Sequence, residues 1–510
     1  MLELPVLTIL IITPLLGALA TIMVRDQGDA RQQDIAYRIA FSFALLTSAL
    51  SLLTLYFFEH GKVGFQFEER ASWIPQLGIS WHLGIDGISV WLVALASLLV
   101  PLAMIAGRES VRVRVREHVV ALLVLQSVLI GTFCALDMIL FFVFYEAALI
   151  PLFLLIGSQR GEGRSQAAFN FVLFNMVGSV CLLVAILVIG WQGGTFDIPV
   201  LMTHKLSPQM QMWLWVAMFV SFAVKMPMWP VHTWLPEVHV HAPTAVSMLI
   251  AGVHMKLGTY GFLRLLLPLL PDACHYFAPL VITLGAITVM QSSIVAVSQD
   301  HIKRVLAYAT MAHMGFTAIG VFSLTVQSIE GTVLMIFVQG MVSACLFMCA
   351  GSLYDRIQTY EMSRISGLIS TMPKFAFVFL MLVLGAVGLP GTATFLGELL
   401  IMIGAFHSLP LITVLAGSVI VIGPVYFFSS YHRILFTSST GREVASGADL
   451  PQNQLIAIGC VLALMVWLGV HPAGFFSTTD ATVTQLVATV HLSDDAHALS
   501  IVGPAMGGVK

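Results

Sequence analysis

Five ionisable side chains lie in stretches of the sequence that otherwise read as apolar helix. They are two acids, two lysines and one histidine: Glu146, Lys225, Lys256, His313 and Glu398. A charge at the centre of a bilayer costs about 2.5–3.5 kcal/mol, so helices keep one there only when it has a partner or a task. Because all five groups can gain and lose protons, the set predicts a proton path through a membrane.

Glu146 and Lys225 form the first candidate pair. Glu146 stands alone among large apolar residues at positions 142–151, where a carboxylate takes up a proton unless a cation lies near. Lys225 is the obvious cation. The alternative is a static structural ion pair, but such pairs often add little net stability, which favours a functional role.

Lys256, His313 and Glu398 would continue the path. Lys256 has no acid close in sequence, and burial favours its uncharged form, so it could release and regain a proton. His313 could connect a lysine to a distant acid, directly or through water. His254 is two residues from Lys256 and therefore on another helix face; a packed core histidine explains it equally well.

Three further histidines, His232, His239 and His241, cluster in a segment without lysine or arginine. A metal site is conceivable there. Since no cysteine or group of acids accompanies them, hydrogen bonding or a proton inlet is the better interpretation. The six cysteines are scattered through apolar stretches and are expected to be packing residues rather than redox or metal ligands.

Composition predicts an all-α polytopic membrane protein. Hydrophobic residues make up 58% of the 510 residues and charged residues only 10%, so most of the chain must face lipid or other helices. The apolar run through Val24 is long enough to span, which indicates an uncleaved first helix. A net charge of −3 is too small to indicate a nucleic-acid partner, and the sequence has no phosphate-binding glycine loop, so no nucleic-acid partner is expected.

Fourteen apolar spans follow from windows of about 20 residues. Sixteen of the 23 lysines and arginines fall on loops after odd-numbered spans, including the cluster Arg108–Arg116, and only five on the opposite side. The positive-inside rule then places both termini on the periplasmic side of a bacterial inner membrane.

Two spans carry proline near their middle within a shared pattern, Ala223–Pro227 in span seven and Ala386–Pro390 in span twelve. Proline frees a carbonyl, and at membrane depth a freed carbonyl is tolerated only against protein or water. We therefore predict broken helices within two inverted five-helix repeats, spans 4–8 and 9–13. Ordinary proline kinks are the alternative. The expected units are residues 1–117 with an outside hairpin-like loop, 118–268, 269–440, and 441–510 with a C-terminal helix and tail.

Several longer motifs resemble a known family. They are Trp73-Ile74-Pro75 with Leu83–Ser89, the segment Ala223–Thr244, Asp300–Arg304, His313–Phe316, and Gly388–Thr392 with Phe395–Glu398. Together they resemble the antiporter-like membrane subunits of bacterial respiratory complex I, from end to end. Glu398, at a position where sister subunits usually have lysine, makes the chain most similar to the subunit M group.

This resemblance implies a proton-translocating, non-redox subunit of NADH:quinone oxidoreductase. It assigns Glu146 and Lys225 to the ion pair, Lys256 to the central lysine, His313 to the bridging histidine and Glu398 to the exit-side acid. It also makes His232 an inlet histidine. NADH, FMN, iron–sulfur clusters and quinone are expected in other subunits, and the partners would be sister membrane subunits and lipid.

The sequence departs from the family pattern at two positions. Gln339 stands where a histidine is usual, and Val240-His241-Ala242-Pro243 replaces the common Val-Glu-Ala-Pro. Since Gln339 cannot titrate, either water alone carries protons past it or the chain is a divergent paralogue whose pumping is altered. Two alternatives share the expected fold: a subunit of a multi-subunit cation/proton antiporter and a subunit of an ion-pumping membrane hydrogenase.

Overall fold

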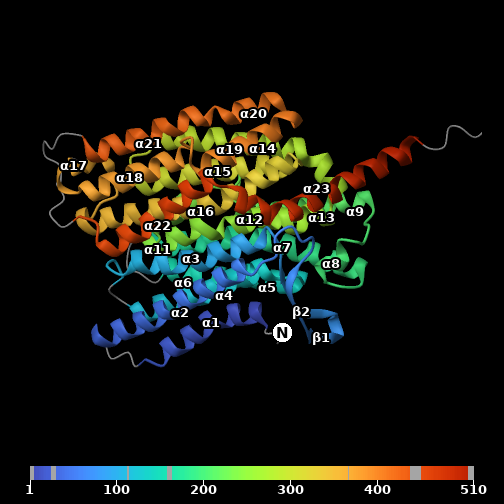
Figure 1. The fold of residues 1–510 in the computed structure, drawn as a ribbon, viewed down its shortest axis with the longest axis horizontal. Coiled ribbons are helices and arrows are strands. Elements are labelled where there is room, and N and C mark those ends of the chain that lie inside the picture. The colour runs from blue at the N-terminus through green and yellow to red at the C-terminus, as the bar shows by residue number, and fades with distance from the viewer. Residues whose placement is uncertain are drawn as a thin grey trace, which may run out of the picture.

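The structure is a computed structural model, and it describes residues 5–24, 30–111, 114–157, 163–365, 367–436 and 449–502. Nearly all of these residues are helical, and the helices lie side by side in one elongated bundle (Figure 1). Both chain ends lie outside the described residues, as do Arg25, Arg112, Arg160 and Arg442, which the charge count above includes.

The N-terminal half of the bundle runs from α1 to α13. Its helices are α1 (Val6–Ile22), α2 (Ala30–Tyr56), α3 (Ser89–Gly107), α4 (Val115–Cys134), α5 (Met138–Ala147), α6 (Leu149–Gly157), α7 (Arg164–Gly193), α8 (Ile198–Leu201), α9 (Pro208–Lys225), α10 (Trp234–His241), α11 (Thr244–Leu249), the π-helix η2 (Ile250–His254), α12 (Lys256–Gly261), the π-helix η3 (Phe262–Leu266) and α13 (Leu267–Leu269).

The C-terminal half follows the same pattern of long helices joined by short turns. It contains α14 (Pro271–Val297), α15 (Ile302–Phe322), α16 (Val326–Ile357), α17 (Leu368–Thr371), α18 (Pro373–Ala386), α19 (Ala393–Ser408), α20 (Pro410–Gly417), α21 (Val419–Leu435), α22 (Gln452–Val470) and α23 (Ala473–Val502).

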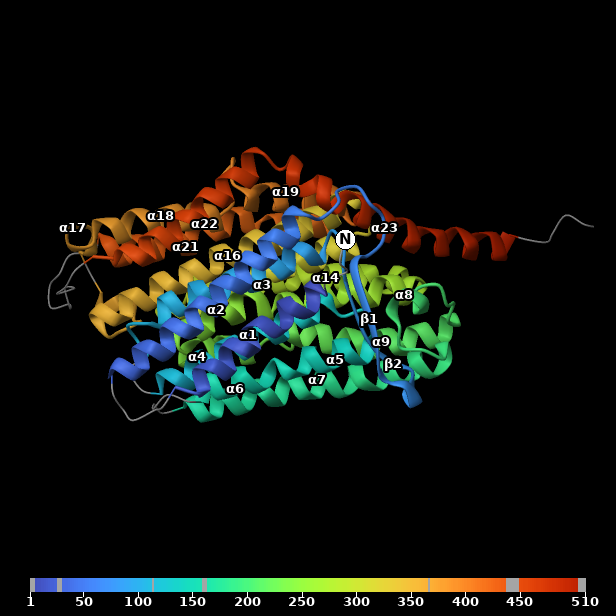
Figure 2. The ribbon, with the colours of Figure 1, turned by 60° about the horizontal axis from the view of Figure 1, so that its bottom comes forward.

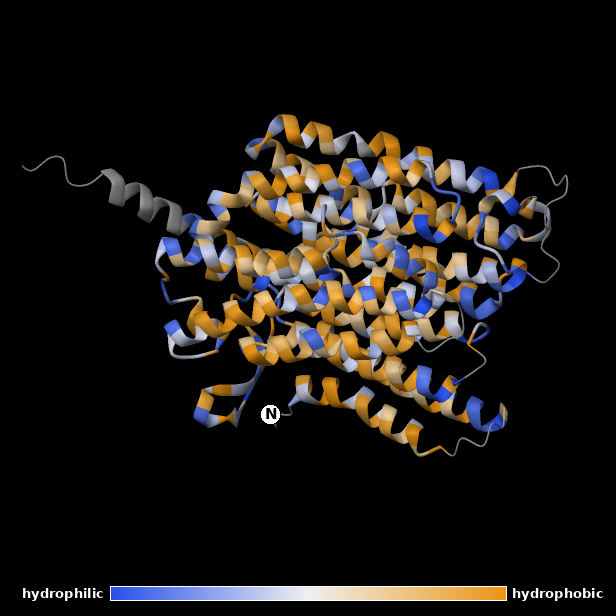
Figure 3. Ribbon diagram, turned by 180° about the vertical axis from the view of Figure 1, so that it is seen from behind, coloured by the Kyte–Doolittle hydropathy of each residue, from blue (hydrophilic) through white to orange (hydrophobic). Residues whose placement is uncertain are grey.

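The described residues contain eleven helical segments long and apolar enough to cross a membrane, and three shorter apolar helices. Large apolar side chains also stay exposed on the outside of the bundle, among them Leu19, Val180, Leu411 and Val421. Apolar residues accordingly dominate the helices seen from behind (Figure 3). Such a surface is stable against lipid but not against water, so the predicted all-helical polytopic membrane protein is confirmed.

The most deeply buried spans are α16 and the segment from α11 to α13. Every residue in the most apolar window of each is buried. The two approach closely, since a Cβ added to Gly252 would lie 3.2 Å from the Gly340 carbonyl oxygen. α16 also packs against α3, α15, α18 and α19. The bundle core is therefore made by the helices that carry Lys256 and Gln339.

Two helices are interrupted in mid-span, as predicted. The first break is residues 226–233, between α9 and α10, and the second break is residues 387–392, between α18 and α19. α9 begins near α8 at one end of the bundle and α18 begins near α17 at the other, so the two broken helices run in opposite directions (Figure 1). This is the orientation expected of inverted repeats.

The loop between α2 and α3 folds into an antiparallel hairpin of β1 (Gln66–Ile74) and β2 (Ile79–Ile85). The Glu69 carboxylate on β1 accepts hydrogen bonds from the backbone N–H groups of Leu7 at 2.6 Å and Thr8 at 3.0 Å, which caps α1. The hairpin lies at the same end of the bundle as α8 in both views (Figure 2).

After the last span, the chain continues as the long helix α23. It packs against α13, α14 and α16. Apolar windows do not predict this helix because Thr478, Thr479, Asp480 and Thr482 interrupt the hydrophobic run. The structure thus has two helices where the sequence predicts one helix and a tail.

Candidate functional site

Lys225 is the last residue of α9, and its side chain is buried at the first break. Its Nζ donates to the Tyr145 carbonyl oxygen at 2.9 Å, lies 3.2 Å from the centre of the Tyr145 ring, and is 3.8 Å from Glu146 Oε1. A carbonyl, an aromatic face and a carboxylate all favour a cation. The pocket around Nζ is therefore built for a charged ammonium.

Glu146 belongs to α5 and is less enclosed than Lys225. Its side chain is 21% exposed, against 2% for Lys225. The Ser179 hydroxyl on α7 lies within hydrogen-bond distance of Glu146 Oε1 and of the Asn175 carbonyl oxygen, and it can donate to either. The pair therefore joins a fully buried cation to an acid at the edge of the bundle, where an adjacent protein could reach it.

Lys256 lies in the bundle core, directly after the π-helix η2. It is fully buried, and its Nζ donates to the Ala251 carbonyl oxygen. Ser343 on α16 contacts the same carbonyl oxygen at 3.5 Å. No ion pair to Lys256 is present among the described residues. An ammonium with one carbonyl acceptor and no counterion can give up its proton more easily than a paired one.

The second break brings His313 and Glu398 together. His313 on α15 has its Nε2 3.5 Å from Glu398 Oε1 and 3.1 Å from the Ala386 carbonyl oxygen. Both side chains are buried, with 6% and 8% of their area exposed. Helix α19 begins with the Thr392 side chain capping Phe395 N, which fixes the turn that carries Glu398.

Glycine shapes the space for that carboxylate. Gly388 has a φ of +76°, and a Cβ on it would lie 2.7 Å from Glu398 Oε2. Any other residue at this position would be strained and would displace the acid. At the second break, the Glu398 carboxylate therefore lies against Gly388. The residue that corresponds to Gly388 at the first break is Lys225, which carries a cation.

Gln339, the departure from the family pattern, contacts this site directly. Its Nε2 lies 2.9 Å from His313 Nδ1, and it is buried on α16. This contact could not be predicted from the sequence, because it depends on how α15 and α16 pack. Gln339 therefore lies next to the predicted site and contacts one of its residues, His313.

The other predicted histidines make fewer contacts. Within the part of the chain that the structure describes, neither ring nitrogen of His254 or His239 has a hydrogen-bond partner, and neither has Nδ1 of His232. His254 packs on Phe171 and His239 stacks on Phe347. Buried imidazole nitrogens of this kind are normally satisfied by water, so the region between α9 and α12 has the polar groups that water requires.

Sequence reasoning missed a buried ion pair toward the β-hairpin end of the bundle. Arg264 on η3 lies 2.7 Å from Asp86, with side chains 7% and 3% exposed, and its Nε contacts the Tyr260 hydroxyl at 3.0 Å. The sequence places Arg264 among the outside basic residues. Asp86 is 178 positions away, so only the fold reveals their contact.

Lys303 is the second charge that sequence reasoning placed differently. It is buried at the start of α15, where its Nζ donates to the Ala242 carbonyl oxygen at 2.7 Å. It lines a cavity of about 660 Å³ together with Arg108, Arg164 and Tyr360. Burial, and then the charges of Lys303 and Arg304, lowers the pKa of the adjacent His301 to about 4. At neutral pH His301 therefore adds no charge to this cavity.

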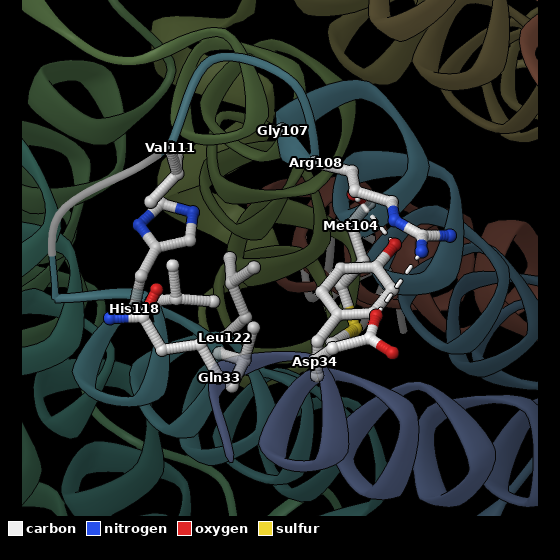
Figure 4. A pocket seen from close by; sticks show the side chains of 11 residues that line it. Gln33, Asp34, Met104, Gly107, Arg108, Val111, His118 and Leu122 are labelled. Atoms are coloured by element: carbon white, nitrogen blue, oxygen red, sulfur yellow. Dashed lines mark hydrogen bonds and ion pairs between the residues drawn. The ribbon is translucent and has the colours of Figure 1, made fainter. Parts of the chain in front are cut away.

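A second, smaller cavity of about 240 Å³ lies between α2, α3 and α4 (Figure 4). Arg108 reaches Asp34 across it at 3.3 Å, and the Tyr37 hydroxyl donates to the Met104 carbonyl oxygen at 3.1 Å. None of the predicted proton-path residues lines it. It belongs to the packing of the N-terminal helices rather than to the site.

All six cysteines are free thiols, so none of them forms a disulfide bond. Among the described residues, no group of three or more His, Cys, Asp or Glu side chains could hold a metal ion. The chemistry that the observed site can supply is proton exchange between Lys, Glu and water.

A helical membrane bundle with two oppositely directed broken helices, one beside a lysine and the other beside a glutamate, defines the class of antiporter-like ion-translocating membrane subunits. Residues 135–423 match the family model described as NADH:quinone oxidoreductase/Mrp antiporter, TM. The chain belongs to this family, within its group of NADH-quinone oxidoreductase subunit M and NADH-ubiquinone oxidoreductase chain 4 proteins.

Three relatives illustrate the similarity. NADH-ubiquinone oxidoreductase chain 4 of Marchantia polymorpha is 39% identical over 479 residues, covering 94% of this chain and 96% of the relative. NADH-quinone oxidoreductase subunit M of Rhodobacter capsulatus is 37% identical over 499 residues, covering 95% and 97%. A chain of the Thermus thermophilus respiratory complex I structure with bound NADH superposes with a TM-score of 0.86 at 28% identity, covering 95% and 99%.

Proposed function

We propose that this chain is a proton-translocating membrane subunit of NADH:quinone oxidoreductase, respiratory complex I. It moves protons from the cytoplasm to the periplasm along a path lined by Glu146, Lys225, Lys256, His313 and Glu398, with His232 near the inlet, and redox chemistry in other subunits drives it. The observation that carries the proposal is the Glu146–Lys225 pair, in which a buried lysine meets an acid that is partly exposed at the bundle surface.

The mechanism is electrostatic. A change of charge in an adjacent subunit draws Glu146 toward or away from Lys225. When Glu146 moves away, Lys225 loses its counterion and releases its proton toward Lys256, and the charge passes on to Glu398. His313 stands between the core and Glu398, in contact with the acid.

The energies are of the right size. Moving one proton against about 150–200 mV requires about 3.5–4.6 kcal/mol. Two unit charges about 4 Å apart interact by about 4 kcal/mol at an effective dielectric constant of about 20. Making and breaking one pair at the observed 3.8 Å is therefore about sufficient for one step, whereas a distant charge alone is not.

The remaining assignments follow from the same proposal. The chain lies in the inner membrane of a bacterium with both termini on the periplasmic side, beside sister antiporter-like subunits. NADH, FMN, iron–sulfur clusters and quinone belong to other subunits, and this chain binds none of them. His254 has no defined role in the path.

Glu146→Gln tests the proposal in inverted membrane vesicles that contain the assembled complex. NADH-driven proton uptake and quinone reduction are measured side by side. Both are expected to fall together, because the neutral amide cannot pair with Lys225. The matched control is Glu59→Gln, which removes an exposed Glu59–Lys62 pair of 2.9 Å and should change neither rate. Unchanged proton uptake in Glu146→Gln would contradict the proposal.

The family model that matches this chain also covers Mrp antiporters, so cation/proton antiport is the second candidate. A subunit of an ion-pumping membrane hydrogenase is the other alternative that the sequence leaves open. Sodium-dependent proton exchange without NADH oxidation would favour the antiporter, and copurification with hydrogenase subunits would favour the hydrogenase. Proton uptake that requires NADH and no sodium would support complex I.

A further inference from the structure

The two nitrogens of His313 face groups of different chemistry. Nε2 lies 3.1 Å from the Ala386 carbonyl oxygen and 3.5 Å from Glu398 Oε1. A carbonyl oxygen can only accept a hydrogen bond, and so can an ionised carboxylate. Nε2 must therefore carry a hydrogen, since a bare nitrogen here would face lone pairs on both sides.

The second break explains why the Ala386 carbonyl is free to accept. In an α-helix this oxygen would accept from the backbone N–H four residues later. That residue is Pro390, which has no N–H. Helix α18 ends at Ala386, and the next turn is closed by Leu389 N donating to Leu384 O at 3.0 Å instead. The sequence thus builds a fixed acceptor for His313.

Among the described residues, Nδ1 of the same ring has its hydrogen-bond contact with Gln339. The Gln339 amide nitrogen is 2.9 Å away, and the residue is 1% exposed. With the hydrogen on Nε2, the neutral ring has its lone pair on Nδ1, which an amide N–H₂ satisfies. Gln339 can donate a hydrogen bond to this nitrogen, but it cannot donate a proton.

We propose that Gln339 is a positioning residue that keeps His313 neutral, with its hydrogen on Nε2, so that His313 serves as a fixed hydrogen-bond donor to Glu398 rather than as a proton carrier. The proposal rests on the proposed function and sharpens the role of one residue in it. A histidine at position 339 could hand a proton to Nδ1; the glutamine closes that route.

The proton balance is simple. The Nε2–H bond of His313 does not break, and no proton is added at Nδ1. Glu398 gains a proton by way of water from the side of Lys256 and then loses it toward the periplasm. While Glu398 is ionised, the Nε2–H of His313 stabilises its carboxylate.

The competing arrangement has His313 as a proton carrier. An imidazolium would have hydrogens on both nitrogens, so the Gln339 amide would have to rotate and present Oε1 to Nδ1–H. Gln339 Oε1 has no hydrogen-bond partner among the described residues. The two arrangements make opposite predictions for a substitute at position 313 that donates but cannot titrate.

His313→Gln provides such a substitute, because the glutamine amide nitrogen can reach the position of imidazole Nε2. It is compared with His313→Met, which has similar bulk and no donor. NADH-driven proton uptake and quinone reduction are measured in inverted vesicles and normalised to assembled complex. We expect His313→Gln to lower both rates by about threefold or less and His313→Met by about tenfold or more. Equal large losses in both variants would overturn the proposal.

Gln339 is tested by two further variants. Gln339→Met removes the amide donor at nearly constant volume and should lower turnover per assembled complex by about two- to tenfold. Gln339→His restores a donor and should recover activity relative to Gln339→Met. Full turnover in Gln339→Met would overturn the proposal, as would failure of Gln339→His to exceed Gln339→Met.

A control separates a positioning role from a structural one. Gln126→Met removes another buried amide, whose Nε2 donates to the Ser97 carbonyl oxygen at 3.0 Å in the N-terminal helices. It should reduce the amount of complex but not its turnover. Glu398→Gln separates the two proposals: unchanged coupled turnover there contradicts the proposed function, whereas equal large losses in His313→Gln and His313→Met contradict only the role given to Gln339.

Discussion

The two breaks have the same Ala-Val-x-x-Pro pattern but hold charges of opposite sign. At the first break, the third residue of the pattern is Lys225, and a partly exposed acid from another helix reaches it. At the second break, the equivalent residue is Gly388, and the buried carboxylate of Glu398 occupies the space that its Cβ would need.

This difference separates two tasks. Lys225 is buried and its partner Glu146 is 21% exposed at the edge of the bundle, where, in the proposed function, a charge in an adjacent subunit acts on it. The Glu398 carboxylate is enclosed and has a histidine donor, so it suits the last acceptor of the path. In the proposed function, the first copy of the repeated element is therefore the input and the second copy is the output.

The largest expected effect is at the first break. Lys225→Met leaves Glu146 without its cation and the proposed path without a proton-transferring group, so NADH-driven proton uptake per assembled complex should fall by about a hundredfold. Lys62→Met is the control, because it removes a lysine whose side chain is 56% exposed. Proton uptake of Lys225→Met within a few fold of the parent would remove the distinction between input and output.

Gly388→Ala tests the space at the second break. The methyl group would meet Glu398 Oε2, and the positive φ disfavours alanine, so coupled turnover should fall by about tenfold. Gly367→Ala is a matched control: its φ is +65°, but a Cβ there meets nothing within 4 Å. If both variants lose the same turnover per assembled complex, backbone strain alone explains the effect and the comparison fails.

The smallest effect should come from the prolines. Pro390→Ala supplies an N–H that competes with His313 for the Ala386 carbonyl, so turnover should fall by about threefold. Pro227→Ala should change turnover less, because the corresponding Ala223 carbonyl already accepts from Met228 N at 2.9 Å. The rates of NADH-driven quinone reduction in the two variants are compared. A larger loss in Pro227→Ala than in Pro390→Ala would contradict the role of the Ala386 carbonyl as the acceptor for His313.

Sequence reasoning predicted the fold because a membrane leaves few choices. Apolar length fixes the spans, and proline at membrane depth fixes the breaks. It also singled out Glu146 and Lys225, because unpaired charges in lipid are costly, and the structure has them in contact. Their roles in transport stay predictions.

The contacts that could not be predicted from the sequence depend on how the helices pack. Gln339 reads as a missing histidine until α16 is placed against α15, where its amide meets His313. The sequence predicts Lys303 to be a loop charge because it lies at the start of a helix. In the structure its side chain is buried, and its Nζ donates to the Ala242 carbonyl oxygen. Arg264 and Asp86 lie on segments that only the folded bundle brings together.

Lys256→Met tests the central claim most directly, because Lys256 lies in the core between the two breaks and carries no structural ion pair in the described part of the chain. The initial rates of NADH-driven proton uptake and of quinone reduction would be measured separately in inverted vesicles with the parent and the variant, each normalised to assembled complex. A path through this chain predicts that proton uptake and quinone reduction both fall. Parental proton uptake by the assembled Lys256→Met complex would contradict the account.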